Sequence, residues 1–195
     1  MVSGKRSIIR ELRRTDRPDL LSWHRRLYLH IGKLNPRRYQ TRLSRQDAEA
    51  DAKESLRLLR KAGGFVLIAE LDREPVGFVV AEVLEFPHRH HRLTHRPELT
   101  GQIDTLFVEE SARNVGVGTA LLQAAEKRLR ADGCDNLQLG VVEENEAARN
   151  LYAGLGYREL GRRHRKDIGK PPRDWEDARR KRNLVRKPPK RARGR

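Results

Sequence analysis

"ARNVGVGTALL", residues 112–122, places two glycines two positions apart, between a run of strand-like residues and a run of helix-like residues. The first turn of a helix has N–H groups without partners and carries a partial positive charge. Glycines immediately before such a turn let an anion approach the bare backbone. Gly116 and Gly118 therefore predict a phosphate-binding loop at a strand-to-helix junction.

The spacing of these glycines does not match two common nucleotide-binding loops. A dinucleotide fingerprint needs a third glycine at position 121, which is Leu121. A nucleotide P-loop needs Lys and then Ser or Thr after its last glycine, whereas Gly118 is followed by Thr119 and Ala120. A tight turn that needs glycine for its geometry alone stays open as an alternative.

Charge is distributed unevenly along the 195 residues. The formal net charge is +16, and residues 169–195 hold twelve Lys and Arg against three acidic residues. This segment has two Pro pairs and few apolar side chains, so it cannot bury enough surface to offset the entropy of ordering. We expect a folded domain over residues 1–168 and a basic, mostly disordered tail over residues 169–195. The excess of positive charge favours anionic partners.

Several function classes are disfavoured by composition. No apolar run reaches the roughly 18 residues that a membrane helix needs, and charged side chains stand where a signal peptide would be hydrophobic. We therefore expect a soluble, cytoplasmic protein. Cys134 is the single cysteine, so it cannot form an internal disulfide, and no Cys and His pair has the spacing of a zinc site.

Along residues 1–168, apolar patterns typical of strands alternate with apolar patterns typical of helices. Apolar patterns typical of strands cover residues 7–12, 65–71, 76–86, 102–108, 136–142 and a last segment from Tyr157. Apolar residues at helical spacing predict helices over residues 15–31, 44–61, 118–131 and 145–153. Asp16 or Thr15 is the expected cap of the first helix, and a turn at residues 72–75 joins an antiparallel hairpin. The pattern predicts an α/β fold without repeats.

Two motifs resemble those of the GCN5-related N-acetyltransferase (GNAT) superfamily. The first, which follows the strand end "LFVEES", is Arg113-x-x-Gly116-x-Gly118. The second is Asn145-x-x-Ala148-x-x-Leu151-Tyr152-x-x-x-Gly156-Tyr157, with Tyr157 where the family pattern has Phe. Both occur in the family's order and between the expected elements. The resemblance is sharpest over residues 101–160, looser over residues 5–100, and absent from the tail.

The resemblance implies a mixed, mostly antiparallel central sheet flanked by helices. Its strands at residues 102–108 and 136–142 would splay apart to form a cleft for acetyl-coenzyme A. The backbone expected to hold the pyrophosphate, with Arg113 adding charge, is that of Asn114, Val115, Gly116, Val117, Gly118 and Thr119. The residues expected to line the pantetheine arm are Leu106, Phe107 and Val108, and the Val108 N–H would polarise the thioester carbonyl.

Acetyl transfer to an amine needs a neutral amine, a polarised carbonyl and a proton for the departing thiolate. Tyr152 is the candidate acid, because the resemblance implies that it is aimed at the coenzyme sulfur; a core-packing tyrosine is the alternative. Asn145 is expected to cap the helix that follows it and to contact the pantetheine. Because Cys134 lies far in sequence from these residues, we expect direct attack in a ternary complex.

The general base has several candidates. Asp104 is the first, because amine acetyltransferases of this family carry a carboxylate at the matching place, and strand alternation predicts that Asp104 and Leu106 share one sheet face. Asp is shorter than the Glu commonly seen there, so a water relay is favoured. Glu82 and Glu85 are the reserves. His88, His90, His91 and His95 lie in a loop that is expected to border the acceptor pocket rather than to bind a metal.

The acceptor stays open between small amines, aminoglycoside-like compounds and protein amines. Two other classes of function also stay open: a nucleic-acid- or ribosome-associated binding protein that uses the basic tail, and a transferase of longer acyl groups. Binding through the tail would weaken steeply as salt rises. A homodimer is compatible with the family, and nothing in the sequence decides it.

Overall fold

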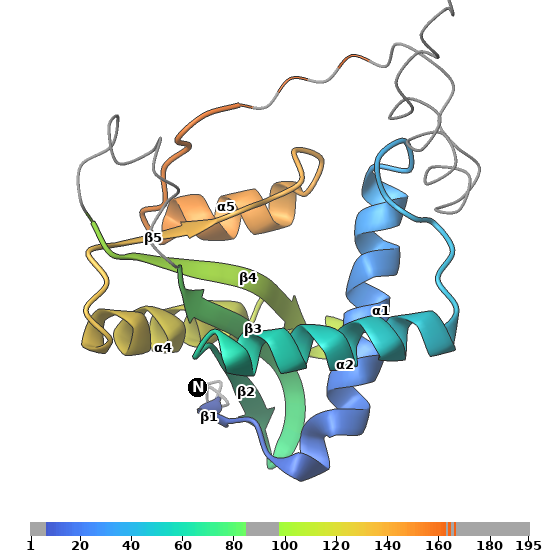
Figure 1. Ribbon diagram of the computed structural model, residues 1–195, viewed down its shortest axis with the longest axis horizontal. Coiled ribbons are helices and arrows are strands. Elements are labelled where there is room, and N and C mark those ends of the chain that lie inside the picture. Colours follow the sequence, from blue (N-terminus) through green and yellow to red (C-terminus); the bar gives the residue numbers. More distant parts are fainter. Residues whose placement is uncertain (1–6, 85–97, 163, 165, 167–195) are drawn as a thin grey trace, which may run out of the picture. The chain divides into compact units, whose positions relative to one another are not determined.

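A computed structural model of the chain describes residues 7–84, 98–162, 164 and 166. The chain divides into two units, residues 1–158 and residues 159–195. The helices and strands of the described residues all lie in the first unit (Figure 1). In the second unit, Arg162 Nε donates to Glu159 Oε1 at 2.8 Å.

A five-stranded sheet forms the centre of the first unit. Its strands lie in the order of the sequence: β1 (Ile8–Glu11), β2 (Phe65–Leu71), β3 (Glu74–Val83), β4 (Thr100–Val108) and β5 (Asn136–Leu139). The first four are antiparallel, and β5 runs parallel to β4. Asp72 and Arg73 both have positive φ, as the tight turn of a hairpin requires. The predicted mixed, mostly antiparallel sheet is confirmed.

Helices flank the sheet, and short 3-10 turns precede two of them. The helices are α1 (Arg17–Leu34), α2 (Arg45–Lys61), α4 (Val117–Ala131) and α5 (Glu146–Gly154), and the turns are η1 (Arg14–Asp16) and η2 (Glu110–Ala112). The Ser44 hydroxyl caps α2 by accepting from the Asp47 N–H at 3.0 Å. The four helices agree with the predicted ones to within a few residues.

Both faces of the sheet are covered by apolar side chains from the helices. On one face, α4 buries Val117, Leu121, Leu122, Ala125 and Leu129 against β2, β3 and β4. Leu151 and Tyr152 of α5 pack against this same cluster. On the other face, α1 contributes Leu20 and Trp23, and α2 contributes Leu59. The Trp23 ring stacks on Phe78 of β3 and Phe107 of β4, with centroids 5.9 Å apart in each pair.

Two predicted features of the elements are wrong. Residues 157–162 form no strand, and β5 ends at Leu139 instead of continuing to Val142. From Arg158 to Arg162 every residue is exposed, and the one apolar side chain among them, Leu160, is 89% exposed. A strand there would bury no apolar face, so nothing offsets the entropy of ordering it.

Asp16 also differs from its predicted role. It stands at the N-cap position of α1, but its side chain does not cap the helix. The carboxylate instead accepts from the Arg13 N–H at 2.6 Å and from both terminal nitrogens of Arg10 at 2.7 and 2.9 Å. Asp16 is 4% exposed, so its carboxylate has lost most of its hydration on folding. These hydrogen bonds take the place of the lost water.

Candidate functional site

The strands β4 and β5 diverge part of the way along their length. Their pairing runs from Thr100 and Asn136 to Ile103 and Leu139, and then ends. At the next position β4 has a bulge: Val80 and Ala81 of β3 face Thr105 and Ile103, so Asp104 has no partner. Beyond the bulge, the ribbon of β4 turns away from β5 (Figure 1). This divergence is the splay that the family resemblance implied.

The freed edge of β4 presents backbone groups to the space beside β5. The Glu109 N–H donates to Val76 O at 2.8 Å, and the Phe107 carbonyl oxygen lies close to Gly77, so both residues point toward β3. Successive residues of a strand point to alternate sides. Leu106 and Val108 therefore direct their N–H and C=O groups away from β3, toward the opening.

A loop with two left-handed residues leads from β4 into α4. Asn114 has φ 61° and Gly116 has φ 90°, and such alternation turns successive N–H groups toward one concave side. Arg113 Nε donates to the Val108 carbonyl at 3.0 Å, which fixes the start of the loop to the end of β4. A side chain on Gly116 would meet no atom within 4 Å, so the space in front of this backbone is open.

In the part of the chain that the structure describes, no side chain caps the N-terminus of α4. Gly116 is its N-cap residue and supplies no side chain, and the first turn contains no acidic residue. The first backbone bond of the helix runs from the Ala120 N–H to Gly116 O at 2.9 Å. The N–H groups of Val117, Gly118 and Thr119 therefore remain for a ligand, and the partial charge of the helix favours an anion there.

Gly118 stands where α4, α5 and β4 meet. A Cβ atom at this position would lie 3.2 Å from Leu151 Cδ2 and 3.8 Å from Val108 Cγ2. The first distance is shorter than an ordinary van der Waals contact. Glycine thus keeps a passage open between the helix start and the freed edge of β4.

The helix α5 brings the second motif to this opening. The Asn145 side-chain oxygen accepts from the Ala148 N–H at 3.2 Å, so its predicted role as a cap is confirmed. Tyr152 packs against the core cluster under α4. Its ring centroid lies 6.0 Å from that of Tyr157. Burial raises the pKa of Tyr152, so the phenol keeps its proton at neutral pH.

The predicted sharing of one sheet face by Asp104 and Leu106 is wrong. Leu106 packs against the cluster under α4, to which Ile103 also belongs. These two residues are three positions apart, whereas residues on one face of a regular strand are two positions apart. The bulge absorbs one residue and reverses the alternation. Asp104 therefore lies on the opposite face, where its charge acts on Tyr28 of α1.

Asp104 lies at the surface, and the pKa of its carboxyl is raised above the ordinary value. Partial burial raises the pKa of Asp104, and hydrogen bonding with the side chains of Gln102 and Glu82 acts in the opposite direction. A higher pKa makes a carboxylate a stronger proton acceptor. Glu82, a reserve candidate, thus lies beside Asp104 and not at a separate place.

The sequence did not indicate two side chains of α1: Tyr28, on which the charge of Asp104 acts, and its neighbour His24. His24 is buried, its ring lies edge-on to Tyr28 at 4.4 Å, and its Nε2 is 3.9 Å from Asp51 of α2. Burial raises the pKa of Tyr28 and lowers that of His24. Their spacing of four residues places the two side chains on one face of the helix. The sequence could not single them out, because this spacing recurs throughout any amphipathic helix.

A hollow of about 210 Å³ lies between the second half of α1 and the end of β4. Its basic lining residues are Arg26, His30, Lys33 and Arg113. Arg26 lies over the Phe107 ring, with its guanidinium carbon 5.3 Å from the ring centroid, and pairs with Glu109. Glu110 also lines the hollow, so, among the described residues, the unpaired positive charge beside the loop that precedes α4 comes from Lys33 and Arg113, and it favours a ligand bearing phosphate groups.

Some predicted residues lie outside the described part of the chain. They are Glu85, the four histidines His88, His90, His91 and His95, and the basic segment 169–195. Within the described residues, no group of three or more His, Cys, Asp or Glu side chains is placed to hold a metal ion. The helices of that same part include none that is long and apolar enough to cross a membrane.

Comparison with known sequences gives consistent matches. The model of the acetyltransferase (GNAT) family matches residues 18–157. N-alpha-acetyltransferase 30 of Saccharomyces cerevisiae is 34% identical over 91 residues, which are 47% of each chain. An N-alpha-acetyltransferase of Sulfurisphaera tokodaii is 33% identical over 96 residues, 48% of this chain and 56% of that one. The chain thus spans about half the length of the curated relatives that it matches.

Solved structures share the fold at low sequence identity. A Bacillus halodurans protein, solved as a tetramutant, superposes with a TM-score of 0.70 at 21% identity over 83% of this chain and 99% of its own. A predicted acetyltransferase of Clostridium acetobutylicum, solved with acetyl-CoA, gives 0.63 at 15% identity over 84% and 97%. Aminoglycoside N-acetyltransferase AAC(6')-Iy, solved with CoA, gives 0.59 at 19% identity over 89% and 99%.

Proposed function

Because this chain belongs to the acetyltransferase (GNAT) family, we propose that it transfers the acetyl group of acetyl-coenzyme A to a primary amine. One observation carries the proposal: the freed edge of β4 opens directly onto the uncapped N-terminus of α4. An extended chain that ends in phosphate groups fits such a junction. The edge offers hydrogen bonds along its length, and the helix start offers N–H groups at its end.

The pyrophosphate, the pantetheine arm and the thioester of the coenzyme each have residues that would hold them. The N–H groups from Asn114 to Thr119 would bind the pyrophosphate, with Arg113 and the basic hollow supplying charge. The backbone of Leu106 and Val108 would bind the pantetheine arm, with Phe107 between them packed into the core. The Val108 N–H points into the opening and would polarise the thioester carbonyl.

The reaction we propose is a direct attack without a covalent enzyme intermediate. Asp104 takes a proton from the acceptor, directly or through a water, and the neutral amine forms the new C–N bond. The C–S bond then breaks, Tyr152 gives its proton to the departing thiolate, and the extra proton on the attacking nitrogen passes to the tyrosinate, directly or through a water. Cys134 is no substitute nucleophile: it packs against the core, and burial raises its pKa, which keeps the thiol protonated.

The acceptor that we favour is the α-amine of a polypeptide. Its support is the activity in the names of the two curated relatives, each more than 30% identical to this chain. The aminoglycoside acetyltransferase is a weaker guide, because it shares the fold at 19% identity. A free N-terminus has an ordinary pKa of about 8, against about 10.4 for a lysine, so more of it is already neutral at pH 7 and it depends less on a base such as Asp104.

Release of the coenzyme thiol tests the proposal. The assay supplies acetyl-CoA with one of three acceptors: a peptide with a free N-terminus, an aminoglycoside or a small diamine. We expect turnover with the peptide and none with the same peptide blocked at its N-terminus. Turnover with the aminoglycoside or the diamine, and none with the peptide, would support acetyl transfer and contradict the peptide acceptor. No thiol release with any acceptor, from protein that binds acetyl-CoA, would contradict the proposed activity.

A further inference from the structure

A second hollow lies at the other end of α1. It has a volume of about 310 Å³ and is lined by Leu12, Arg13, Arg14, Arg17 and Arg60. The residues come from the segment between β1 and α1, the first turn of α1 and the last turn of α2. All four arginines are exposed. We call this the arginine hollow.

Two acidic residues next to the arginine hollow are already engaged. Asp16 is bound by Arg10 through two hydrogen bonds. Glu70 is bound by Arg10 at 2.5 Å, and Arg13 approaches it only to 3.8 Å. Within the described residues, Arg14, Arg17 and Arg60 have no ion pair. The hollow therefore presents three guanidinium groups that no carboxylate of the described residues binds in an ion pair.

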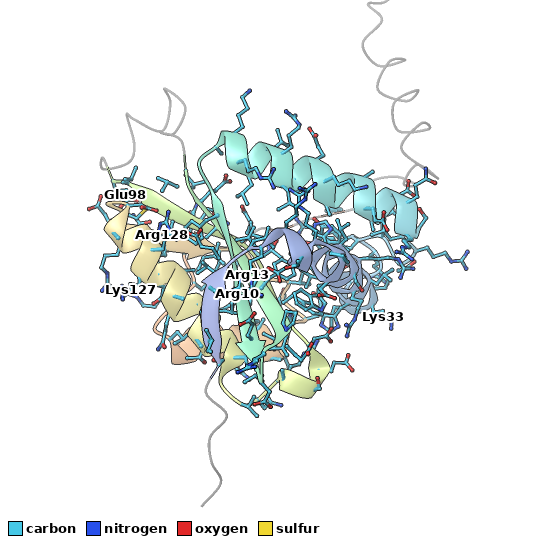
Figure 2. All side chains as sticks on the ribbon, turned by 90° about the horizontal axis from the view of Figure 1, so that it is seen from below. Arg10, Arg13, Lys33, Glu98, Lys127 and Arg128 are labelled. Carbon is cyan, nitrogen blue, oxygen red and sulfur yellow. The ribbon has the colours of Figure 1, made fainter. Side chains whose placement is uncertain are left out.

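The arginine hollow is separate from the proposed acetyl-transfer site. The basic hollow beside the transfer site is lined by Arg26, His30 and Lys33, in the second half of α1. Arg17 and Lys33 are sixteen positions apart on this helix, about 24 Å at 1.5 Å per residue. In the view from below, Arg10 and Arg13 lie near the centre of the face and Lys33 at one side (Figure 2).

We propose that the arginine hollow binds the phosphate backbone of a nucleic acid duplex. Arginine is suited to phosphate, because its planar fork donates two parallel hydrogen bonds. The hollow contains no aromatic ring on which an unpaired base could stack, and Leu12 is its one apolar lining residue. These features fit contacts to backbone phosphates, which carry no sequence information. The net charge of +16 adds long-range attraction to such a polyanion.

Other phosphate-bearing partners fit the same surface less well. Docking to a lipid bilayer needs apolar side chains that enter the membrane, and the hollow offers only the half-buried Leu12. A single small phosphate would need enclosure, whereas four exposed arginines from three elements can contact several phosphates at once. The proposal does not rest on acetyl transfer.

The test compares two variants of the full chain that lose the same charge. The first is Arg14→Gln/Arg17→Gln/Arg60→Gln. The control, Arg45→Gln/Lys127→Gln/Arg130→Gln, removes three exposed cations at the start of α2 and on α4. Fluorescence anisotropy of a labelled DNA duplex of arbitrary sequence gives the affinity between about 50 and about 200 mM salt. Thermal melting confirms that both variants are folded.

We expect the hollow variant to bind the duplex at least about tenfold more weakly than the control variant does. The slope of log affinity against log salt should become shallower by about 3, because each lost phosphate contact removes about 0.9. Thiol release should stay at the wild-type level. Equal affinities and equal slopes for the two variants would overturn the proposal.

Two further outcomes would also overturn it. One is a hollow variant that loses binding to vesicles of anionic lipid while its binding to the duplex is unchanged. The other is that inorganic phosphate saturates the arginine hollow of the wild-type protein and leaves the affinity for the duplex unchanged. Failure of acetyl transfer in the wild-type protein would leave these comparisons unaffected, since they measure binding alone.

Discussion

Asp104 shows how one residue can decide which face of a sheet carries a reactive group. The sequence pattern QIDTLFV has an ordinary strand alternation, and this placed Asp104 with Leu106. The bulge at Asp104 depends on how β4 pairs with β3, which lies outside the strand's own sequence. Asp104 consequently faces Tyr28 and Glu82 on the side covered by α1 and α2.

Asp104→Asn should lower turnover by about 10²-fold or more and leave the affinity for acetyl-CoA nearly unchanged, because the amide cannot accept the amine's proton. The raised pKa of Asp104 gives the wild-type rate an acidic limb, since turnover rises with pH as this carboxyl ionises. The variant should lack that limb in a pH profile of thiol release. Glu82→Gln is the comparison: if it has the larger effect, the base is Glu82.

Tyr152→Phe should lower turnover by about 10²-fold at saturating acetyl-CoA, because the leaving thiolate loses its proton donor. Tyr157→Phe is a matched control: its ring lies 6.0 Å away, and its hydroxyl donates to Glu126 at 2.9 Å. The control should keep wild-type turnover. Steady-state thiol release gives the turnover of both variants and of the wild type. Equal rates for Tyr152→Phe and the wild type would show that Tyr152 is not the acid.

At the scale of elements, two ion pairs that share Arg10 join β1, β2 and the turn before α1. Arg10 of β1 binds Asp16 beneath α1 and Glu70 of β2. The Arg10 guanidinium holds the pKa of Asp16 below its ordinary value of 3.8. The sequence indicated Asp16 as a cap residue, but its partner Arg10 is set by tertiary packing and not by local spacing.

Asp16→Asn should lower the free energy of unfolding by about 3 kcal/mol, because a buried partner of Arg10 loses its charge. The loss should be largest above about pH 4, where Asp16 is ionised in folded and unfolded chains alike. It should shrink as pH falls through the lowered pKa of Asp16. Denaturant unfolding against pH measures this. Asp19→Asn, an exposed change nearby, should stay within about 0.5 kcal/mol, and an equal loss there would contradict the assignment.

The elements themselves were largely predictable from local signals. Asn145 caps α5 as expected, Ser44 is the residue at which the second helix was predicted to begin, and both motifs meet the N-terminus of a helix. The divergence of β4 from β5 was implied by the family resemblance and not by periodicity. The position of Tyr28 near Asp104 was not predictable, because only the packing of α1 on the sheet shows which of its side chains the charge of Asp104 reaches.

At the scale of the whole molecule, the packed cores lie in the unit of residues 1–158. We predict that the chain truncated after Ile168 keeps its thermal midpoint and its affinity for acetyl-CoA. The truncation removes twelve Lys and Arg with three acidic residues, so affinity for any polyanion should fall. Differential scanning calorimetry and titration check both statements. A large drop in the thermal midpoint would show that residues 169–195 belong to the folded domain.

The central claim is that the loop before α4 and the freed edge of β4 hold acetyl-CoA, and calorimetric titration tests it most directly. We expect micromolar binding of acetyl-CoA by the wild-type chain and none of NADPH or ATP at the same concentration. Gly118→Val should abolish that binding, because its side chain would fill the passage beside Leu151 and Val108. Gly154→Val, whose Cβ meets no atom within 4 Å, should bind as the wild type does. Wild-type affinity in a folded Gly118→Val protein would contradict the account.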